Sequence, residues 1–449
     1  MKQSEIIALD AKHVWHPCAQ MKDYEDFPPL PVASASGSHI ITKDGRRIID
    51  AISSWWCKAL GHGHPRIRCA VEKQMDKFEH VLLANTCNET VAELSARLAG
   101  LCPPLTRVFY ADNGSTAMEI AMKMSLQYHL QTGMPERRHF ASLSNGYHGE
   151  SILTLAAGDC ELYSSPFAAV LPRIQKLAPI RYCSGPQDPA WQGFPEEAWN
   201  KIKNSLDAKA EQLSAIIFEP VLQGAGGMLI YSPDLLRRLR DWADKNHVQL
   251  IADEIMTGFA RTGPMLACEH AGIKPDFIAL SKGLTAGWGP MSAVLCSEDT
   301  YMAFYGDYFS GKAFMHSNTY CGHALGAAAA LETLKIFEEE DIPGQVKHRS
   351  QFLADCMKSV ADSTKSLRNL RSIGFMAAAD IVNPSTGQPY PKELRIGFKA
   401  SQAALRRGAL LRPLGDTIYF LPPLNTDNNT LTQLAEITEA ALCESTKNA

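Results

Sequence analysis

The sequence has no long apolar run and no cluster of basic residues. No stretch of the 449 residues approaches the roughly 20 apolar residues that a membrane-spanning helix needs. The first residues, MKQSEIIALDAKHVWHP, contain no apolar signal core. Lys and Arg number 44 against 48 Asp and Glu, which gives a net charge of −4 without any Lys/Arg run. These absences argue against an integral membrane protein, a secreted protein, and a nucleic acid or an anionic membrane as a partner.

Paired cysteines are also lacking. The twelve cysteines are scattered, with no CxxC pair and no regular spacing, so we expect reduced thiols and a cytoplasmic protein. His62 and His64 in GHGHP are close enough in sequence for a metal site, but no further cluster of ligands accompanies them. A turn that leads into a helix beginning near Pro65 is the better interpretation, and we expect no metal.

The composition is that of an ordinary globular protein, with 45% hydrophobic and 20% charged residues. The length exceeds the size at which one hydrophobic core keeps growing, so two or three substructures are expected. We predict an N-terminal segment at 1–64 that contributes to a small domain and to the active site. A large domain at 65–330 and a C-terminal small domain at 331–449 follow.

Strand-like and helix-like segments alternate between about 65 and 330. The strand-like segments are RVFYA, AIIFEP, VQLIAD and DFIALS, and the helical ones include STAMEIAMKMSLQYHL and SPDLLRRLRDWADKNH. In the second helix Ser232 is the expected N-cap and Pro233 lies in the first turn. The alternation predicts an α/β fold, with a mostly parallel sheet covered by helices.

The two ends of the chain have a different pattern. Residues 1–35 are expected to be irregular, and SHIITKDGRRIID is expected to form a hairpin that turns at Asp44 and Gly45. After residue 331, GFMAAADIV, ALLRP and TIYFLPP are strand-like, whereas ELRIGFKASQAALRRG and TLTQLAEITEAALCES are amphipathic helices. This pattern predicts a smaller α+β domain, which the N-terminal segment joins.

A carboxylate and a lysine follow two neighbouring buried strands. Asp253 ends VQLIAD, and Lys282 follows DFIALS, 29 positions later. Ligands bind at such strand ends in open α/β sheets. A partly desolvated lysine there can lose its proton near neutral pH and attack a carbonyl group, and a carboxylate can keep a pyridine nitrogen protonated. The pair is what a pyridoxal 5′-phosphate enzyme needs, although either residue alone could be a turn former or a surface lysine.

The segment ADNGSTAME follows a strand and opens a helix. Backbone N–H groups at a helix N-terminus, together with Gly114 and the hydroxyl of Ser115, suit a phosphate. An ordinary strand-to-helix turn is the alternative, but the cofactor that Lys282 and Asp253 suggest requires an anion site. Thr319 in HSNTY is a second possible phosphate ligand.

Aromatic residues and arginines supply further candidates. Tyr147, after an Asn-Gly turn, could stack on a flat ring or be a partly buried anchor, and Trp55 with Trp56 could wall an apolar pocket. Arg412 and Arg261 lie near glycines and are suited to bind a carboxylate, but each could equally be a surface residue. Glu219, at the end of AIIFEP, could pair with a substrate-binding arginine or be a simple cap.

These segments together resemble the class III, or ω-type, aminotransferases, which are pyridoxal 5′-phosphate-dependent transferases of fold type I. The resemblance covers nearly the whole chain and is most specific in IADEIMTGFARTG and in the spacing from Asp253 to Lys282. It implies that Lys282 holds the cofactor covalently and moves the proton, and that Asp253 pairs with the pyridine nitrogen. Gly114 and Ser115 would hold the phosphate, and Tyr147 would stack on the ring and touch substrate.

The resemblance also implies a homodimer with active sites at the subunit interface. Thr319, with Asn318, would reach the phosphate that is bound in the neighbouring subunit. The substrate pocket would be lined by Trp55, Ser317 and Arg412, together with Tyr147 and Lys282, and Arg412 would meet a carboxylate. Cys18 occupies the pocket position directly after WHP, where the family often has a tyrosine.

The segments HVWHP, SSWW, NGYHGE and EPVLQGAGGM indicate the substrates. They resemble those of family members that transfer an amino group from S-adenosylmethionine to 8-amino-7-oxononanoate in biotin biosynthesis. Because Cys18 cannot supply an aromatic face, we expect Tyr24 or another aromatic residue to replace that contact. Three alternatives stay open: an ω-aminotransferase acting on other diamines or ω-amino acids, lysine as the amino donor, and a non-catalytic nucleotide-binding protein.

Overall fold

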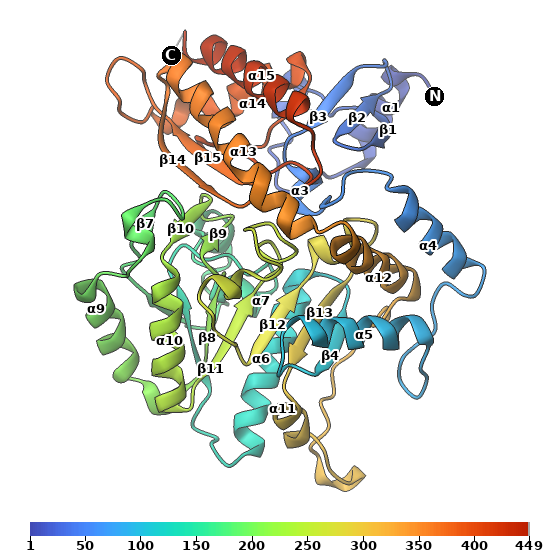
Figure 1. The fold of residues 1–449 in the computed structure, drawn as a ribbon, viewed down its shortest axis with the longest axis vertical. Helices are drawn as coiled ribbons and strands as arrows, with labels where there is room; N and C mark the ends of the chain where they lie inside the picture. The colour runs from blue at the N-terminus through green and yellow to red at the C-terminus, as the bar shows by residue number, and fades with distance from the viewer. Residues whose placement is uncertain (448–449) are drawn as a thin grey trace.

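A seven-stranded sheet forms the centre of the larger, lower part of the molecule (Figure 1). The computed structural model describes residues 1–447. The strands of the sheet, in spatial order, are β4 (Arg107–Ala111), β13 (Ser292–Cys296), β12 (Phe277–Leu280), β11 (Gln249–Asp253), β8 (Leu213–Phe218), β5 (His139–Leu143) and β6 (Gln175–Leu177). Neighbouring strands are parallel except that β13 runs antiparallel to β12 and β4. The prediction of a mostly parallel sheet is therefore confirmed.

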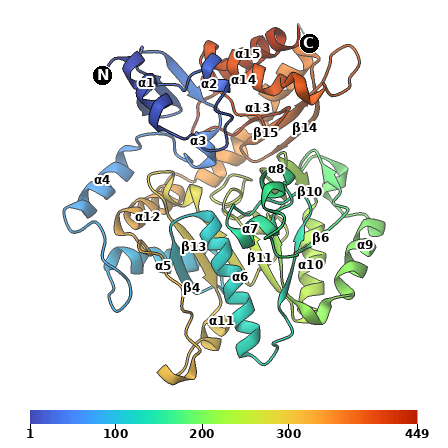
Figure 2. The same ribbon diagram turned by 180° about the vertical axis from the view of Figure 1, so that it is seen from behind.

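Helices cover both faces of this sheet. In β8, Ile216 and Phe218 belong to one apolar cluster with the leucines of α10 (Pro233–Asn246), whereas Ala215 and Ile217 belong to another with α6 (Gly114–Gln131). Helix α10 lies in front of the sheet in Figure 1, and α6 lies in front in Figure 2. Because both faces are buried, the central strands β8, β11 and β12 are mostly apolar and do not alternate between apolar and polar residues. The other helices of this part are α4 (Pro65–Met75), α5 (Glu89–Leu101), α7 (Ile152–Ala157), α8 (Glu161–Ser164), α9 (Glu196–Asp207), α11 (Glu298–Ala303) and α12 (Ala324–Glu339).

The smaller, upper part of the molecule is assembled from both ends of the chain (Figure 1). A four-stranded sheet has the order β1 (Val32–Ser36), β2 (His39–Thr42), β3 (Arg47–Asp50) and β16 (Ala409–Leu410), and β16 pairs in parallel with β3. Strands β2 and β3 form the predicted hairpin. The remaining elements are β14 (Leu367–Ile373), β15 (Met376–Ile381), β17 (Thr417–Phe420), α13 (Ile342–Thr364), α14 (Ile396–Arg407) and α15 (Asn428–Thr446). The division of the chain at residues 64 and 330 stays a prediction.

Strands β14, β15 and β17 form a three-stranded sheet, and another three-stranded sheet lies at the edge of the larger part. The latter consists of β7 (Tyr182–Cys183), β10 (Leu229–Tyr231) and β9 (Leu222–Gln223), all antiparallel. Strand β9 closely follows the end of β8, so this small sheet sits near the carboxyl edge of the seven-stranded one. No helix among residues 1–447 is both long and apolar enough to cross a membrane.

The prediction that residues 1–35 are irregular is wrong. Helix α1 spans Gln3–His13, α2 spans Asp23–Asp26, and β1 begins at Val32. Helix α1 buries none of its residues, so it has no apolar stripe that a sequence pattern could reveal. Its first turn is stabilised locally, because the Lys2 N–H donates to a Glu5 carboxylate oxygen at 2.8 Å.

Candidate active site

A cavity of about 490 Å³ opens at the carboxyl ends of the central parallel strands. Glu219 follows β8, Asp253 ends β11, and Lys282 follows β12, and all three line the cavity. Asp253 and Lys282 lie close together because β11 and β12 are parallel and Asp253 pairs with Ala279, three residues before Lys282. Five of the residues predicted for the site line this one cavity: Gly114, Ser115, Tyr147, Asp253 and Lys282.

Lys282 begins a short 3₁₀ turn, Lys282–Thr285, with a positive φ of 41°. Its Nζ lies 4.7 Å from the centre of the Trp56 ring. The surrounding protein removes most of the hydration of the ammonium group, and this desolvation lowers its pKa, although Asp253 and Glu219 act in the opposite direction. A lowered pKa increases the fraction of neutral amine, which is the form that attacks a carbonyl carbon.

The carboxylate of Asp253 is almost fully buried and held on both oxygens. Oδ1 accepts a hydrogen bond from the Ile255 N–H at 3.1 Å, and Oδ2 lies 2.8 Å from Nδ1 of His148. His148 is itself buried, and its Nε2 has no hydrogen-bond partner within residues 1–447. Sequence reasoning missed His148, although it directly follows Tyr147 in NGYHGE. The imidazole fixes the orientation of the carboxylate toward the cavity.

The wall opposite the strand ends is the N-terminus of α6, an 18-residue helix that begins at Gly114. The side chain of Asn113 caps the helix by accepting from the Thr116 N–H at 3.0 Å. The other N–H groups of the first turn have no partner within the helix, and Ser115 adds a hydroxyl. This wall can hold an anion such as a phosphate.

Two glycines allow the segments around α6 to approach closely. A Cβ at Gly149 would overlap the Ser115 Oγ, and a Cβ at Gly114 would lie 2.9 Å from Cδ1 of Ile255. The N–H of Glu150 donates to the Ser115 hydroxyl at 3.1 Å. Gly114 is thus required for packing against the residue that holds Asp253, which is a different reason from the one the sequence suggested.

Glu219 acts as a cap for two loops and contacts no arginine within the described chain. Its carboxylate accepts from the N–H of Tyr147 at 3.0 Å and from the N–H of Gly224 at 2.8 Å. Burial raises the pKa of this carboxyl group to about 7. The hydroxyl of Tyr147 in turn donates to Glu150 at 2.8 Å. Glu219 therefore fixes the backbone of Tyr147 beside the cavity. The Tyr147 ring lines the cavity and can contact a bound molecule.

Trp55, Arg412 and Cys18 come together outside the main cavity. The Arg412 guanidinium lies 4.3 Å from the centre of the Trp55 ring, and its Nη2 donates to the Cys18 carbonyl at 2.9 Å. Trp56, and not Trp55, lines the cavity itself. The two adjacent tryptophans therefore serve different parts of the site.

Two aromatic residues, Tyr163 and Tyr147, lie near Cys18. The Tyr163 ring lies 5.6 Å from that of Tyr147, and burial together with the nearby Cys18 and Glu150 raises the pKa of the Tyr163 hydroxyl. Tyr24 instead packs against the ring of His16 at 4.9 Å. The sequence offered no signal for Tyr163, because it lies far from Cys18 along the chain.

Trp55 and Trp56 are presented by an unusual turn, α3, at Ser53–Trp56. All four residues have positive φ, at 49°, 45°, 71° and 73°, and none of them is glycine. The left-handed conformation costs roughly 1–2 kcal/mol for each residue with a side chain. Strain of this kind persists only where surrounding contacts hold it.

Ser317, Asn318 and Thr319 do not line the cavity of their own chain. The Thr319 carbonyl accepts from Nε2 of His80 at 2.8 Å, and the Asn318 N–H donates to Sγ of Cys321 at 3.2 Å. Large apolar side chains near them are exposed, namely Phe309, Met315 and Tyr320. This segment can therefore contribute to a site only if it meets another chain.

Arg261 is buried and is not available to a substrate. Its Nη1 donates to the carbonyls of Phe375 at 3.0 Å and Pro422 at 2.8 Å, and burial lowers the pKa of the guanidinium to about 9. The expected alternatives for Arg261, a carboxylate ligand or a surface residue, are both wrong. The residue ties the segment after β11 to the C-terminal part of the chain.

Comparison with known proteins agrees with this arrangement. A protein of Geobacter sulfurreducens named adenosylmethionine-8-amino-7-oxononanoate aminotransferase is 36% identical over 420 residues, 92% of each chain. A protein of the same name from Helicobacter pylori is 37% identical over 425 residues, 94% of each chain. The crystal structure of the protein so named from Methanocaldococcus jannaschii has a TM-score of 0.92 at 30% identity and covers 99% of each chain.

A second kind of relative is an amine transaminase from an uncultivated Pseudomonas species, solved in its pyridoxal-phosphate-bound form. It is 30% identical, with a TM-score of 0.86, and covers 96% of this chain and 98% of its own. Residues 20–442 match the family model for class-III aminotransferases. The lysine and the carboxylate at the cavity agree with these similarities. The chain belongs to the class III aminotransferases.

Proposed function

We propose that this aminotransferase transfers an amino group from S-adenosylmethionine to 8-amino-7-oxononanoate, giving 7,8-diaminononanoate for biotin biosynthesis. The observation that carries the proposal is the meeting of Lys282 and Asp253 at one cavity beside an anion-binding helix N-terminus. The substrates are inferred from relatives of that name, which match more than nine-tenths of the chain.

The donor set of the cavity fits pyridoxal 5′-phosphate. It offers an amine at Lys282, a carboxylate at Asp253, N–H groups and a hydroxyl at Gly114 and Ser115, and an aromatic ring at Tyr147. When bound, this cofactor withdraws electrons from the carbon that bears the amine and carries the amino group between the two substrates. Asp253, whose Oδ2 lies 2.8 Å from Nδ1 of His148, would keep the pyridine nitrogen of the bound cofactor protonated.

Lys282 is the group that moves the proton. Its lowered pKa lets it accept a proton from the substrate carbon at neutral pH and deliver it to the bound cofactor within the same half-reaction, and the second half-reaction would use the same lysine in the opposite direction. Trp56 and Glu219 close the cavity around it and limit the access of water. Trp55, with Arg412 against its ring, provides an aromatic face and a cation that suit the apolar chain and carboxylate of the acceptor.

The proposal includes a cytoplasmic homodimer with active sites at the subunit interface. Thr319 and Asn318 are away from the cavity of their own chain and adjoin exposed apolar side chains, which supports a role across an interface. In such a dimer Thr319 would contact the phosphate in the neighbouring subunit, and Ser317 would line its substrate pocket.

The direct test combines a covalent assay with product analysis. Borohydride reduction of the wild-type holoenzyme should fix the cofactor on Lys282, detectable by peptide mass spectrometry, and Lys282→Ala should lose both the adduct and turnover. Incubation with S-adenosylmethionine and 8-amino-7-oxononanoate should yield 7,8-diaminononanoate. An adduct that survives in Lys282→Ala would refute the assignment of the lysine.

A second candidate is an ω-aminotransferase with another substrate. It is favoured by an ω-transaminase of Pseudomonas jessenii, whose structure has a TM-score of 0.90 at 26% identity. The residue after WHP, which bears on recognition of the amino donor, is Cys18. The identity of the amino donor therefore distinguishes the two candidates. Under our proposal, S-adenosylmethionine bleaches the visible band of the holoenzyme and lysine does not. Bleaching by lysine alone would change the donor and leave the family unaffected.

A further inference from the structure

The left-handed turn Ser53–Trp56 connects β3 with the segment that leads to α4, and it carries two tryptophans to the site. It forms a genuine turn, because the Trp56 N–H donates to the Ile52 carbonyl at 2.8 Å and the Lys58 N–H donates to the Ser53 carbonyl at 3.0 Å. No glycine relieves the backbone. Some neighbouring group must therefore stabilise a conformation that these residues do not favour alone.

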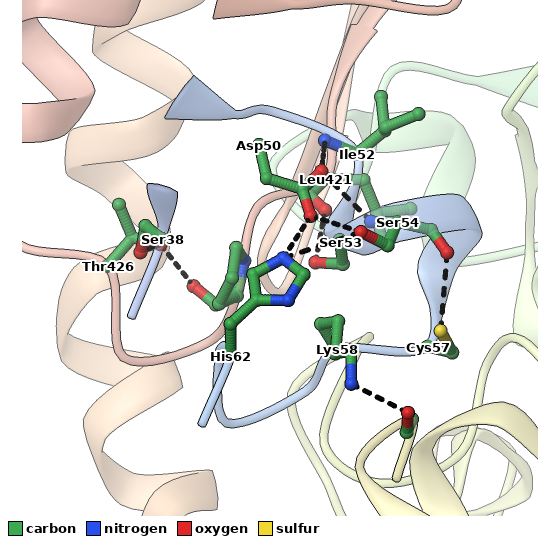
Figure 3. Close-up of polar contacts among 12 residues, drawn as sticks. Ser38, Asp50, Ile52, Ser53, Ser54, Cys57, Lys58, His62, Leu421 and Thr426 are labelled. Atoms are coloured by element: carbon green, nitrogen blue, oxygen red, sulfur yellow. Dashed lines mark hydrogen bonds and ion pairs between the residues drawn. The ribbon is translucent and has the colours of Figure 1, made fainter. Parts of the chain in front are cut away.

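That group is the side chain of Asp50, the last residue of β3, which has no exposed surface. Oδ1 accepts from the Ser54 N–H at 2.9 Å and lies 3.4 Å from the Ile52 N–H. Oδ2 accepts from the Ser54 hydroxyl at 2.7 Å and from Nε2 of His62 at 2.8 Å (Figure 3). These hydrogen bonds lower the pKa of the Asp50 carboxyl group in spite of its burial.

The turn links Asp50 to both sides of the active site. Trp56 donates from Nε1 to the Tyr419 hydroxyl at 3.0 Å, and its ring lies 4.7 Å from Nζ of Lys282. Trp55 lies against the guanidinium of Arg412 at 4.3 Å. A change in the backbone of the turn therefore displaces an aromatic wall of the cavity and an aromatic face of the pocket at once.

The group of Ser54, His62 and Asp50 does not form a nucleophilic triad. In a triad the carboxylate and the serine contact different nitrogens of the histidine. Here the same Nε2 of His62 faces both the Asp50 carboxylate, at 2.8 Å, and the Ser54 hydroxyl, at 3.4 Å (Figure 3). The Ser54 hydroxyl donates its hydrogen bond to the Asp50 carboxylate. The cluster therefore positions the backbone and does no chemistry of its own.

We propose that Asp50, supported by His62, is a positioning residue that holds the left-handed turn and thereby sets the substrate pocket through Trp55 and Trp56. This inference rests on the proposed function, because it assigns the turn to recognition of the two substrates. Loss of the carboxylate lets the turn relax, and the indoles leave their places. The residues that would hold the cofactor, Asp253 at the end of β11 and Lys282 after β12, are on other segments and make no hydrogen bond to the turn, so we expect them to keep their geometry.

The experiment separates the backbone effect from loss of a hydroxyl. Asp50→Asn should raise KM for 8-amino-7-oxononanoate and lower kcat/KM by about tenfold or more, with kcat less affected. Adding Ser54→Gly should restore kcat/KM by about threefold, because glycine adopts positive φ without strain. Adding Ser54→Ala, the matched control, removes the same hydroxyl but keeps the Cβ and should restore nothing.

Two readouts do not depend on turnover. The near-UV circular dichroism of the tryptophans should change in Asp50→Asn and return toward the wild-type spectrum with Ser54→Gly. The borohydride adduct on Lys282 should form in every variant. If turnover of 8-amino-7-oxononanoate is absent in the wild type, the proposed function fails, and the dichroism still tests the turn.

Either of two results overturns the inference. One is equal behaviour of the double variants that carry Ser54→Gly and Ser54→Ala, in both kcat/KM and dichroism. The other is loss of the Lys282 adduct in Asp50→Asn, which would mean that the turn acts on cofactor attachment and not on substrate recognition. If Asp50→Asn does not fold, His62→Ala replaces it, because it removes one hydrogen-bond partner of the Asp50 carboxylate and leaves the carboxylate itself in place. The variant with His62→Ala and Ser54→Gly must then have a higher kcat/KM than the variant with His62→Ala and Ser54→Ala.

Discussion

Asp253 illustrates how a single carboxylate is prepared by its neighbours before any ligand binds. Its two oxygens are engaged by the Ile255 N–H and by His148, and both partners are fixed by the strand β11 and the buried loop beside it. A preorganised charge in a site from which water is excluded contributes far more than the same charge in water. We therefore expect an electrostatic role for Asp253 that is sensitive to loss of charge at constant shape.

Asp253→Asn should lower kcat by about a hundredfold, equivalent to roughly 3 kcal/mol, because the neutral amide cannot keep the pyridine nitrogen protonated. The Lys282 adduct should still form. Single-turnover kinetics with S-adenosylmethionine measures the effect, and the borohydride adduct is the control. A rate within a few-fold of the wild type would remove Asp253 from this role.

Glu219 should make stability depend on pH in an unusual direction. Its pKa is about 7 in the folded protein, against 4.5 ordinarily, so between these values the folded state binds more protons than the unfolded state. Stability contributed by this group therefore falls as the pH rises from about 4.5 to about 7 and is level above that range. Urea midpoints of the wild type and Glu219→Gln, compared across the window, should diverge with this slope. Parallel midpoints would contradict it.

At the scale of elements, the start of α6 depends on how closely the loop after β5 approaches it. Gly149 has φ of 125°, and a Cβ there would overlap the Ser115 hydroxyl. The glycine thus serves both a positive φ and a close contact. Gly133, with φ of 84° and no atom within 4 Å of its ideal Cβ, shares only the first of these requirements.

Gly149→Ala should weaken cofactor binding by at least about tenfold, because the added methyl group pushes the loop from Ser115 and disturbs the anion site. Gly133→Ala should cost only the backbone strain, about 1 kcal/mol of stability, and should leave the affinity unchanged. Titration of the apoprotein with pyridoxal 5′-phosphate compares the two. Equal affinities would mean that the loop does not shape the anion site.

The elements also show which parts of the fold are encoded in local sequence. Helix α10 was predictable, because Ser232 caps it and Leu235, Leu236 and Leu239 form an apolar stripe. Helix α1 was not, since it buries nothing. The left-handed turn at Ser53–Trp56 was not predictable either, because SSWW contains no glycine and its conformation depends on Asp50 and His62.

At the scale of the whole molecule, strand ends were a good guide to the site. Asp253 and Lys282 meet because parallel neighbouring strands end at one edge, which apolar runs in the sequence reveal. His148, Tyr163 and Arg261 reach their places through contacts between distant segments, which no local pattern encodes. The role of Thr319 depends on a second chain and stays a prediction.

Complementation tests that prediction. Lys282→Ala lacks the reactive amine, and a Thr319→Glu variant should repel a phosphate in the neighbouring subunit. Each homodimer should be inactive, but heterodimers should regain one intact site, since one subunit supplies Lys282 and the other Thr319. Activity after mixing, with subunit exchange verified by two affinity tags, measures this. Failure to recover activity in verified heterodimers would place Thr319 outside the site.

The pairing of β3 with β16 has a consequence for folding during translation. Ile49 is synthesised long before its partner Ala409. Strands far apart along the chain pair slowly, and segments fold in the order in which they are synthesised. The last strand of the seven-stranded sheet to be synthesised ends at Cys296. This sheet can therefore form while β3 still lacks its pairing partner, β16. The half of the pocket that carries Trp55 and Trp56 is completed only after β16 has been made, and until then β3 presents an open strand edge that can pair with another chain and aggregate.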